Sequence, residues 1–354
     1  MSLPRPATVS QLLNLPDPSI LHCSPRLRQE RFLRLTVALR FRRGSRIEIS
    51  ESGRNGAAVA RAIFVGLSTI DIVYGVDEFP AANSKIVAQN QDVFVGGPAA
   101  NACIAFAHLG GDAALVTALG RHPLASVVCE ELRKYSIQLI DLNPGFDGLP
   151  TLSSVFVDSA GNRNVISTNA NRVTIPDAEV DPKLFEQARI VLVDGHYMQA
   201  CQACAAAART REISVVFDGG SWKDGTEELL KNVQTAICSA DFLPPGCATG
   251  EPVFDFLKSC GVTNLAITHG ADPIQFVSGL SSGTLRVPDV EVVDTMGAGD
   301  ILHGAFCYFV SIGRGFVESL ADAANIASES CRSRGTREWM KAQPALNLSP
   351  DPSQ

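Results

Sequence analysis

The sequence predicts an α/β protein with a doubly wound, mainly parallel sheet and helices on both faces. From residue 62 onward, short apolar runs rich in β-branched residues alternate with longer helical segments, which is typical of strand–helix–strand units. Hydrophobic residues make up 45% of the 354 residues, enough for a full core. Polar residues follow several predicted strands, where the ligands of such sheets bind, and these are Asp71, Asp194, Asp218 and His269.

Each element is expected from its own local pattern. Continuous apolar runs predict buried parallel strands at 62–65, 114–117, 190–193, 215–217 and 265–268. Helical periodicity predicts helices at 98–109, 126–135, 197–209, 227–232, 253–259, 299–311 and 317–332. The alternation breaks at 72–95 and 151–169, where strand-like runs are separated by turns without helices. Gly161 and Asn162 give the second stretch the pattern of a hairpin.

A glycine-lined turn precedes the helix expected at 299–311. The segment 294–300 has the sequence Asp-Thr-Met-Gly-Ala-Gly-Asp. Backbone N–H groups at a helix start lack partners and face the positive end of the dipole, so we expect an anion cradle formed by Gly297, Ala298, Gly299 and Asp300. The Asp300 carboxylate can take a proton from an alcohol, and phosphoryl transfer to a hydroxyl needs both features. The alternative is a capped helix in which Asp300 only complements the dipole.

Two signatures in this chain resemble those of the PfkB, or ribokinase-like, carbohydrate kinases. Residues 293–300 resemble the C-terminal signature, and residues 95–111 resemble the N-terminal one, with a Gly-Gly turn, an Asn on the following helix and a Leu-Gly exit. The resemblance covers about 62–335 and is nearest to ketohexokinase-like and sulfofructose-kinase-like members. It implies a ribokinase-like fold, a small β-sheet lid from 72–95 and 151–169, and ATP-dependent phosphorylation of a sugar hydroxyl with Mg²⁺.

The resemblance also implies a set of substrate contacts. Sugar-binding positions of the family match Asp71, Gly96, Gly97, Asn101 and the lid residue Asn83. Lys85 and Arg163 are the cationic residues near the lid that can meet an anionic substrate or a nucleotide phosphate. The simpler alternatives are a turn or cap residue for Asp71, a solvated residue on the helix surface for Asn101 and an ordinary loop residue for Asn83. Lys85 and Arg163 can be solvated cations. No compact basic cluster accompanies Lys85, so a neutral sugar is favoured over a sulfonated or phosphorylated one.

The nucleotide side matches the family less completely. Residues 268–272 resemble the T-x-G-x-x-G loop beneath the nucleotide, although Pro273 replaces its second glycine. ATP contacts are therefore expected from Thr268 and Gly270, with Asn325 and Gly335 on the adenine side. Asp294 and Thr295 lie where several members bind a monovalent cation, so a K+ requirement stays open. The N-x-x-E sequence that organises Mg²⁺ in many members is absent from 241–250, so ATP phosphates and water are expected to hold the ion.

The ends of the chain differ from its centre. Residues 1–60 form an extension rich in arginine and poor in acids, as in an organelle transit peptide. A plastid or mitochondrial location therefore stays open beside a cytoplasmic one, as do an unstructured extension and a start codon assigned too far upstream. The kinase domain is expected at 61–340 and a loose tail at 341–354.

Composition and cysteine spacing limit the partners. A net charge of −7 gives no global basic field for nucleic acid, and no run approaches the 18 apolar residues of a membrane span. Cys201 and Cys204 form a C-x-x-C without a second pair, which favours buried thiols over a metal or redox site. Exposed lid strands can pair between subunits, so a homodimer through the lid is expected as a further option.

Two other functions stay open. A nucleoside kinase of the same fold needs an apolar or aromatic base pocket, and the lid segments are poor in aromatic residues. A catalytically inactive protein that binds sugar or nucleotide is compatible with the missing N-x-x-E. The intact Gly-Ala-Gly-Asp sequence argues against that hypothesis, because an inactive protein has no physical reason to keep both the cradle and the base.

Overall fold

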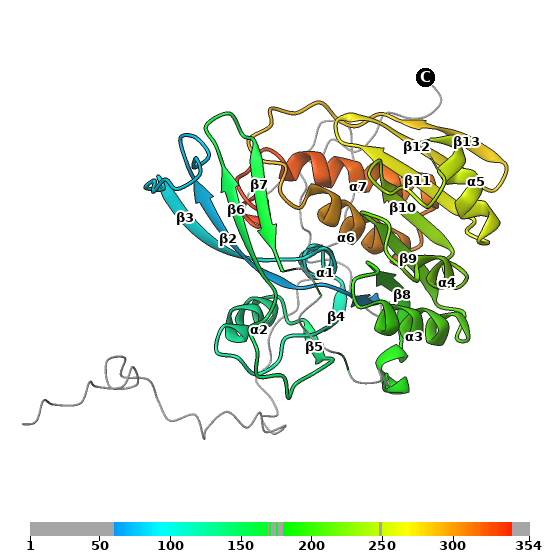
Figure 1. Cartoon of the computed structure of the whole chain (residues 1–354). Helices are drawn as coiled ribbons and strands as arrows, with labels where there is room; N and C mark the ends of the chain where they lie inside the picture. The colour runs from blue at the N-terminus through cyan, green and yellow to red at the C-terminus, as the bar shows by residue number, and fades with distance from the viewer. Residues whose placement is uncertain (1–59, 169, 171–174, 176–179, 248–249, 342–354) are drawn as a thin grey trace, which may run out of the picture. The chain divides into compact units, whose positions relative to one another are not determined.

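The computed structural model describes residues 60–168, 170, 175, 180–247 and 250–341. In this part of the chain, nine strands form a large sheet and four form a smaller one (Figure 1). The expected extension at 1–60 and the expected tail at 341–354 lie almost entirely outside the described residues, and so does the basis for predicting a compartment. No described helix is long and apolar enough to cross a membrane.

The large sheet has the order β13-β12-β11-β10-β9-β8-β1-β4-β5. It is parallel from β11 to β5, and an antiparallel hairpin of β12 and β13 extends one edge. Its strands are β1 (Arg61–Val65), β4 (Asp112–Thr117), β5 (Gln138–Asp141), β8 (Ala188–Val193), β9 (Ser214–Gly219), β10 (Thr235–Ser239), β11 (Asn264–His269), β12 (Asp272–Ser278) and β13 (Ser281–Leu285).

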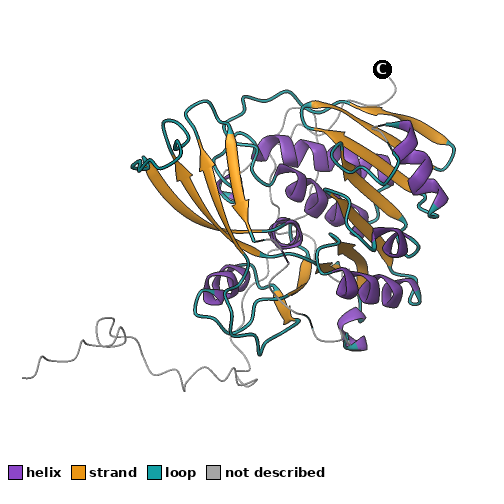
Figure 2. Cartoon of the chain, in the orientation of Figure 1, coloured by secondary structure: helices purple, strands orange, loops and turns teal. Residues whose placement is uncertain are grey.

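Helices cover both faces of this sheet, as Figure 2 shows. Ile63 and Phe64 are neighbours on β1 and both fully buried, yet they belong to two separate apolar clusters, because successive strand residues point to opposite faces. The Phe64 cluster includes α1 (Pro98–His108), α2 (Ala125–Lys134), α6 (Ala298–Ser311) and α7 (Phe316–Ser330). The Ile63 cluster includes α3 (Met198–Arg209), α4 (Thr226–Leu230) and α5 (Glu251–Ser259). Two short 3₁₀ helices are also present in the described residues, at Pro182–Phe185 and Glu338–Met340.

The predicted fold class is therefore confirmed, with four strands missed. All five expected strands and all seven expected helices are present. The short strands β5 and β10 carry polar residues at their ends, which hides the apolar run. The β12–β13 hairpin lies at the sheet edge, where β13 is mostly exposed and needs little apolar alternation.

The two stretches without helices do form a separate sheet, in the order β3-β2-β6-β7. Its strands are β2 (Thr69–Gly75), β3 (Asn90–Gly96), β6 (Leu152–Val157) and β7 (Arg163–Ser167). Asp71 is part of β2 and pairs with Phe94 of β3, so it lies inside a strand of this sheet and not in a loop after β1. Val93, Val165 and Ile166 are exposed on the small sheet, and the homodimer expected there stays a prediction.

A buried carboxylate joins the two sheets to α1. Asp194 follows β8 and accepts hydrogen bonds from the backbone N–H groups of Leu67 at 2.8 Å, Ala99 at 3.2 Å and His196 at 2.9 Å. Leu67 lies between β1 and β2, and Ala99 lies in the first turn of α1. Gly66 has a left-handed φ of 152°, and a Cβ at this position would overlap the Asp194 carboxylate. Only glycine therefore lets the chain pass from one sheet to the other against Asp194.

Replacing Asp194 should destabilise this junction. In Asp194→Ala, buried N–H groups lose their acceptor, so we expect the free energy of unfolding to fall by about 3 kcal/mol. Chemical denaturation measures this change. Asp181→Ala is the matched control, because Asp181 accepts the Lys183 N–H on the exposed surface, and we expect a loss of about 1 kcal/mol or less there. Equal losses in the two variants would contradict the structural role of Asp194.

Candidate active site

Helix α6 begins at a turn that only glycine fits well. Gly297 has a left-handed φ of 69°, and a Cβ there would lie 2.7 Å from Thr336 Cγ2. The first amides of a helix lack intrahelical acceptors. In this turn the Ala298 N–H donates to the Thr295 carbonyl at 3.3 Å, and Gly299 is exposed. The predicted cradle is therefore a left-handed turn followed by the positive end of a 14-residue helix.

Asp300 lies in the first turn of α6 and carries an unusual carboxyl group. Burial, with a smaller contribution from the negative charge of Asp218, raises the pKa of Asp300 to about 7, although the Asn101 hydrogen bond and His303 act in the opposite direction. A carboxyl group that ionises near neutral pH suits a general base, because it can both accept and release a proton.

A largely buried arginine, Arg337, orients the Asn101 amide that contacts Asp300. Asn101 Nδ2 donates to Asp300 Oδ2 at 2.8 Å, and Asn101 Oδ1 accepts from Arg337 Nη1 at 3.0 Å. Arg337 also donates to the Val95 carbonyl at 3.0 Å and to Glu131 Oε1 at 3.1 Å. Because a guanidinium can only donate, Arg337 fixes the Asn101 amide with its nitrogen toward Asp300. No sequence pattern marks Arg337, which is one of several basic residues in the short segment after the last long helix.

On the small-sheet side, Asp71 is held by hydroxyl groups. Thr69 Oγ1 donates to Asp71 Oδ1 at 2.7 Å. Burial raises the pKa of Asp71, and the hydrogen bonds from Thr69 and Ser153 oppose that shift. Two further predicted sugar residues, Gly96 and Gly97, are crowded by the protein itself. A Cβ at Gly96 would overlap the Asp71 carboxylate, and one at Gly97 would overlap the Leu67 carbonyl, so both glycines are explained by packing.

The structure does not bring every predicted substrate residue to this place. Asn83 and Lys85 lie on the exposed loop between β2 and β3, and Asn83 has a left-handed φ of 60°. Within the described residues, neither side chain makes a hydrogen bond or ion pair with Asp71 or Asp300. Asn83 is therefore explained as a turn residue and Lys85 as a solvated cation.

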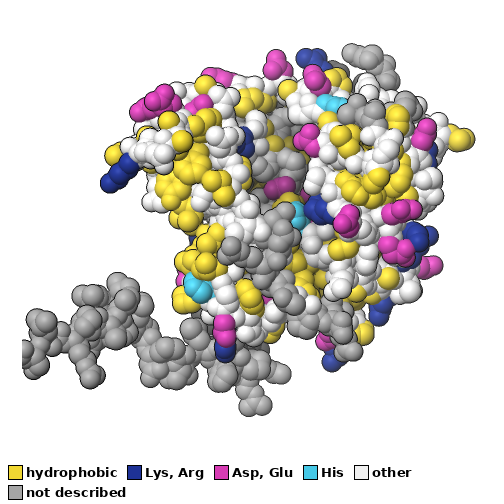
Figure 3. Space-filling view, in the orientation of Figure 1, with side chains coloured by type: hydrophobic (Ala, Val, Ile, Leu, Met, Phe, Trp, Pro, Cys, Tyr) yellow, Lys and Arg dark blue, Asp and Glu magenta, His cyan; other side chains and the backbone are white. Residues whose placement is uncertain are grey.

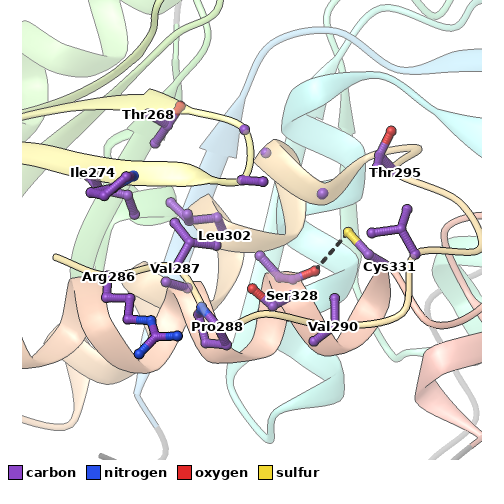
Figure 4. Close-up of a pocket in the computed structure, with 18 of the residues that line it drawn as sticks. Thr268, Ile274, Arg286, Val287, Pro288, Val290, Thr295, Leu302, Ser328 and Cys331 are labelled. Atoms are coloured by element: carbon purple, nitrogen blue, oxygen red, sulfur yellow. Dashed lines mark hydrogen bonds between the residues drawn. The ribbon is translucent and has the colours of Figure 1, made fainter.

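A cavity of about 820 Å³ lies beside the first turn of α6 (Figure 4). The carboxyl ends of β10 and β11 contribute Ser239 and Thr268, and the following loop contributes Gly270. Helix α7 contributes one face, made of Ala324, Ala327, Ser328 and, just beyond the helix, Cys331. Ala298, Gly299 and His303 close the cavity on the α6 side. The cavity therefore reaches the anion cradle directly, at the strand ends where ligands of such sheets bind.

Two residues predicted on the adenine side do not line this cavity. Asn325 lies between Ala324 and Ala327 on α7 but on a different face of the helix. The Gly335 N–H donates to Asp294 Oδ2 at 2.8 Å, and a Cβ at Gly335 would lie 2.9 Å from the Phe94 ring of the small sheet. The geometry thus supports Thr268 and Gly270, and it gives no support to Asn325 and Gly335 as nucleotide contacts.

A histidine and an aspartate lie beneath the cradle. His303 Nδ1 lies 2.7 Å from the Gly299 carbonyl, and Nε2 lies 3.1 Å from the Ile237 carbonyl, so α6 is tied to β10. His303 Nδ1 also lies 3.5 Å from Asp218 Oδ2. That oxygen is buried, and the described residues give it no hydrogen bond. Burial raises the pKa of Asp218, and His303 opposes the shift. Figure 3 shows acidic, basic and histidine side chains within the hollow on this face.

An arginine engages Asp294 and Thr295, the two residues at which several family members bind a monovalent cation. Arg163 Nη2 forms an ion pair with Asp294 Oδ1 at 3.3 Å and donates a hydrogen bond to Thr295 Oγ1. Asp294 Oδ1 also accepts the Met296 N–H at 2.9 Å. The Arg163 side chain therefore contacts the turn before Gly297 and is not free to meet a substrate anion.

Residues 59–343 match the family model described as pfkB family carbohydrate kinase. The chain belongs to that family. The resemblance seen in the two signatures is thereby confirmed, and the family's name agrees with a site that pairs an anion cradle with a carboxylate.

Two relatives and one solved structure illustrate the similarity. The chain is 24% identical over 253 residues to an ATP-dependent ribose-1-phosphate kinase of Halopiger xanaduensis, covering 70% of this chain and 84% of that protein. It is 21% identical to a ribokinase of Bacillus subtilis, covering 78% and 94%. The structure of Arabidopsis thaliana ribokinase complexed with ribose and ATP superposes with a TM-score of 0.65 at 20% identity, covering 81% and 100%. The fold is thus that of ribokinases.

Opposite shifts of the pH profile should follow from two substitutions around Asp300. In the wild type, kcat/KM should fall as the pH drops through about 7, because the base must be ionised. Asn101→Ala removes a hydrogen bond that lowers the pKa of Asp300, so the acidic limb should move to higher pH. Asp218→Asn removes a negative charge that raises this pKa, so the limb should move to lower pH.

A pH series of initial rates under kcat/KM conditions measures both shifts. Asp181→Asn is the control for a change of net charge, since Asp181 is exposed at the start of a 3₁₀ helix, and its limb should not move. Shifts in the same direction for Asn101→Ala and Asp218→Asn would show that Asp300 does not set the acidic limb.

Proposed function

We propose that this protein is an ATP-dependent kinase that phosphorylates a hydroxyl group of a sugar. The observation that carries the proposal is the position of Asp300, a carboxyl group with a pKa of about 7 in the first turn of α6. The cavity of about 820 Å³ borders that turn, and the small sheet, which contains Asp71, lines another cavity against the segment before the turn. Membership of the carbohydrate-kinase family supports the same activity.

The proposed reaction involves ATP, the sugar hydroxyl, the Asp300 carboxylate and the backbone amides at 297–300. ATP occupies the cavity against Thr268 and Gly270, and the sugar is held on the Asp71 side. Asp300 takes the proton of the sugar hydroxyl while its oxygen forms a bond to the γ-phosphorus. The bond from that phosphorus to the β–γ bridging oxygen breaks, and ADP leaves. The amides at 297–300 stabilise the charge on the transferred group, which matters most in phosphoryl transfer. Asp300 then releases its proton to water.

The residues around the cavity fit Mg²⁺ only when the ion is bound to the phosphates of ATP. Asp241 lines the cavity, and the described residues contain no group of three or more His, Cys, Asp or Glu side chains that could hold a metal ion. Magnesium keeps several waters and accepts phosphate oxygens, so it can be carried by the nucleotide. When bound, it neutralises charge on the phosphates.

The substrate that we propose is a neutral sugar, with ribose first in order of testing. The Bacillus subtilis relative is a ribokinase, and the Arabidopsis structure is a complex with ribose and ATP. Arg163 is engaged by Asp294, so it offers less to an anionic sugar than its sequence position suggested. Sugar phosphates still belong among the test substrates, because the relative from Halopiger xanaduensis is a ribose-1-phosphate kinase.

A nucleoside substrate has less support. Tyr74 and Phe156 stack on each other at 5.4 Å, and Tyr74 points to the opposite face of β2 from Asp71, because residues three apart on a strand face opposite sides. Phe94 is thus the aromatic residue of the small sheet that pairs beside Asp71. A single ring at this place does not make the aromatic pocket that a base requires.

The test is ADP release from Mg-ATP with ribose, other pentoses, ketohexoses, aldohexoses, phosphorylated and sulfonated sugars, and nucleosides. We expect turnover with one class of neutral sugar and a loss of about 10³-fold in Asp300→Asn. Nucleotide binding to the variant should be nearly unchanged. Absence of turnover with every substrate, with ATP still bound, would favour the inactive binding protein.

A folding control accompanies this test. Burial raises the pKa of Asp300, so the ionised carboxylate disfavours the folded state above the ordinary carboxyl pKa. Asp300→Asn should therefore melt no lower than the wild type at pH 8, and any advantage should shrink toward pH 5. A large drop in melting temperature at pH 8 would mean that loss of activity reports misfolding.

A further inference from the structure

We propose that Arg163 is a positioning residue for phosphoryl transfer, which replaces a monovalent cation beside the anion cradle and links the small sheet to it. This inference rests on the proposed kinase function, while its cation-binding part can be tested without it. The contact that suggests it is made by Arg163, the first residue of β7, with Asp294 and Thr295 in the turn before Gly297. These two residues lie 131 and 132 positions after Arg163 in the sequence.

The oxygen atoms that a cation would need are already engaged. Asp294 Oδ1 accepts the Met296 N–H and pairs with Arg163, Asp294 Oδ2 accepts the Gly335 N–H, and Thr295 Oγ1 accepts from Arg163. A K+ ion here would have to displace the guanidinium or lie beside a like charge. The donor set therefore does not fit a bound monovalent cation while Arg163 is in place.

The positive charge of Arg163 neutralises the negative charge of Asp294 next to the cradle. Asp294 lies shortly before Gly297, and the Asp294 and Arg163 side chains are only 21% and 28% exposed, which limits screening by water. Without a cationic partner, the Asp294 carboxylate would oppose the binding of phosphate at the adjacent amides. Arg163 cancels that negative charge, so the cradle keeps its attraction for the transferred group.

Arg163 also places the small sheet in contact with the wall between two cavities. A second cavity of about 540 Å³ lies against β2, β3 and the β6–β7 hairpin. Val292 and Thr295 line both cavities, so the segment that they bound separates the nucleotide side from the small-sheet side. Arg163 reaches this segment from the hairpin, whose turn is fixed by Asp158, since Asp158 Oδ1 accepts the Ala160 and Asn162 N–H groups at 2.9 Å.

A consequence concerns ATP in the absence of sugar. If the small sheet moves away, Arg163 leaves Asp294, and the carboxylate then stands uncompensated next to the cradle. Phosphoryl transfer to water should therefore be slow until the small sheet is in place over a sugar. Arg163 makes the cradle depend on the position of the sheet that contacts the substrate.

The experiment compares Arg163→Gln and Arg163→Lys with Arg334→Gln in the full-length chain. Arg334 lines the same second cavity but pairs with Asp92 and Asn90 of β3, so it is a matched control that does not touch the turn. Sugar-dependent ADP release is measured in buffers whose cation is K+, Na+ or tetramethylammonium. Melting temperatures are measured in the same buffers without substrates.

We expect the wild type and Arg334→Gln to respond equally to all three cations. Arg163→Gln should lose about 10²-fold in kcat in tetramethylammonium, with KM for the sugar changed much less, and K+ should restore part of the loss. Its melting temperature should rise with K+ concentration, because a cation now binds beside Asp294. Arg163→Lys should keep most of the activity and stay indifferent to K+.

Several results would overturn the inference. They are a wild type that needs K+, an Arg163→Gln variant with unchanged kcat, and a melting temperature of that variant that ignores K+. Equal losses in Arg163→Gln and Arg334→Gln would reduce Arg163 to a general structural contact. If the wild type turned over no sugar, the proposed kinase function would fail, while the response of the melting temperatures to K+ would still decide whether Arg163 replaces a cation.

Discussion

The hydrogen bond from Asn101 to Asp300 is the interaction on which the site depends. It joins α1 to the start of α6 at 2.8 Å, and Arg337 fixes its direction by occupying the Asn101 oxygen. Arg337 in turn binds the carbonyl at the end of β3 and the Glu131 carboxylate of α2. One guanidinium thus links the base, through Asn101, to β3 and α2, which explains how the Asp300 carboxyl group can hold a fixed direction.

Acidic groups gather at the strand ends at a cost in stability. Burial and the neighbouring carboxylates disfavour the ionised form of Asp300, and Asp218 contributes a buried oxygen without a hydrogen bond in the described part of the chain. A sequence selected only for stability would not place these carboxylates together. The arrangement becomes reasonable if a magnesium ion carried by ATP and a sugar hydroxyl complete it.

Local patterns predicted most of the fold and the centre of the site. Continuous apolar runs and glycine-lined turns report on the backbone, so the strand–helix alternation, the small sheet and the turn at Gly297 followed from the sequence. Arg337, the pairing of Arg163 with Asp294 and the place of Asn325 on α7 did not, because they depend on which helix face or hairpin end meets a distant segment. The family signatures placed Asn101 at the site, while only the packing of α1 against α6 shows that its amide turns to Asp300.

The distances along the chain between these groups carry a consequence for synthesis in the cell. Asn101 and Asp300 are 199 positions apart, and Asn101 and Arg337 are 236 apart. A nascent chain can form α1 and β4 early, yet it cannot orient the base until the segment after α7 has left the ribosome. An incomplete chain therefore holds no aligned base, and the site is assembled among the last contacts of the domain to form.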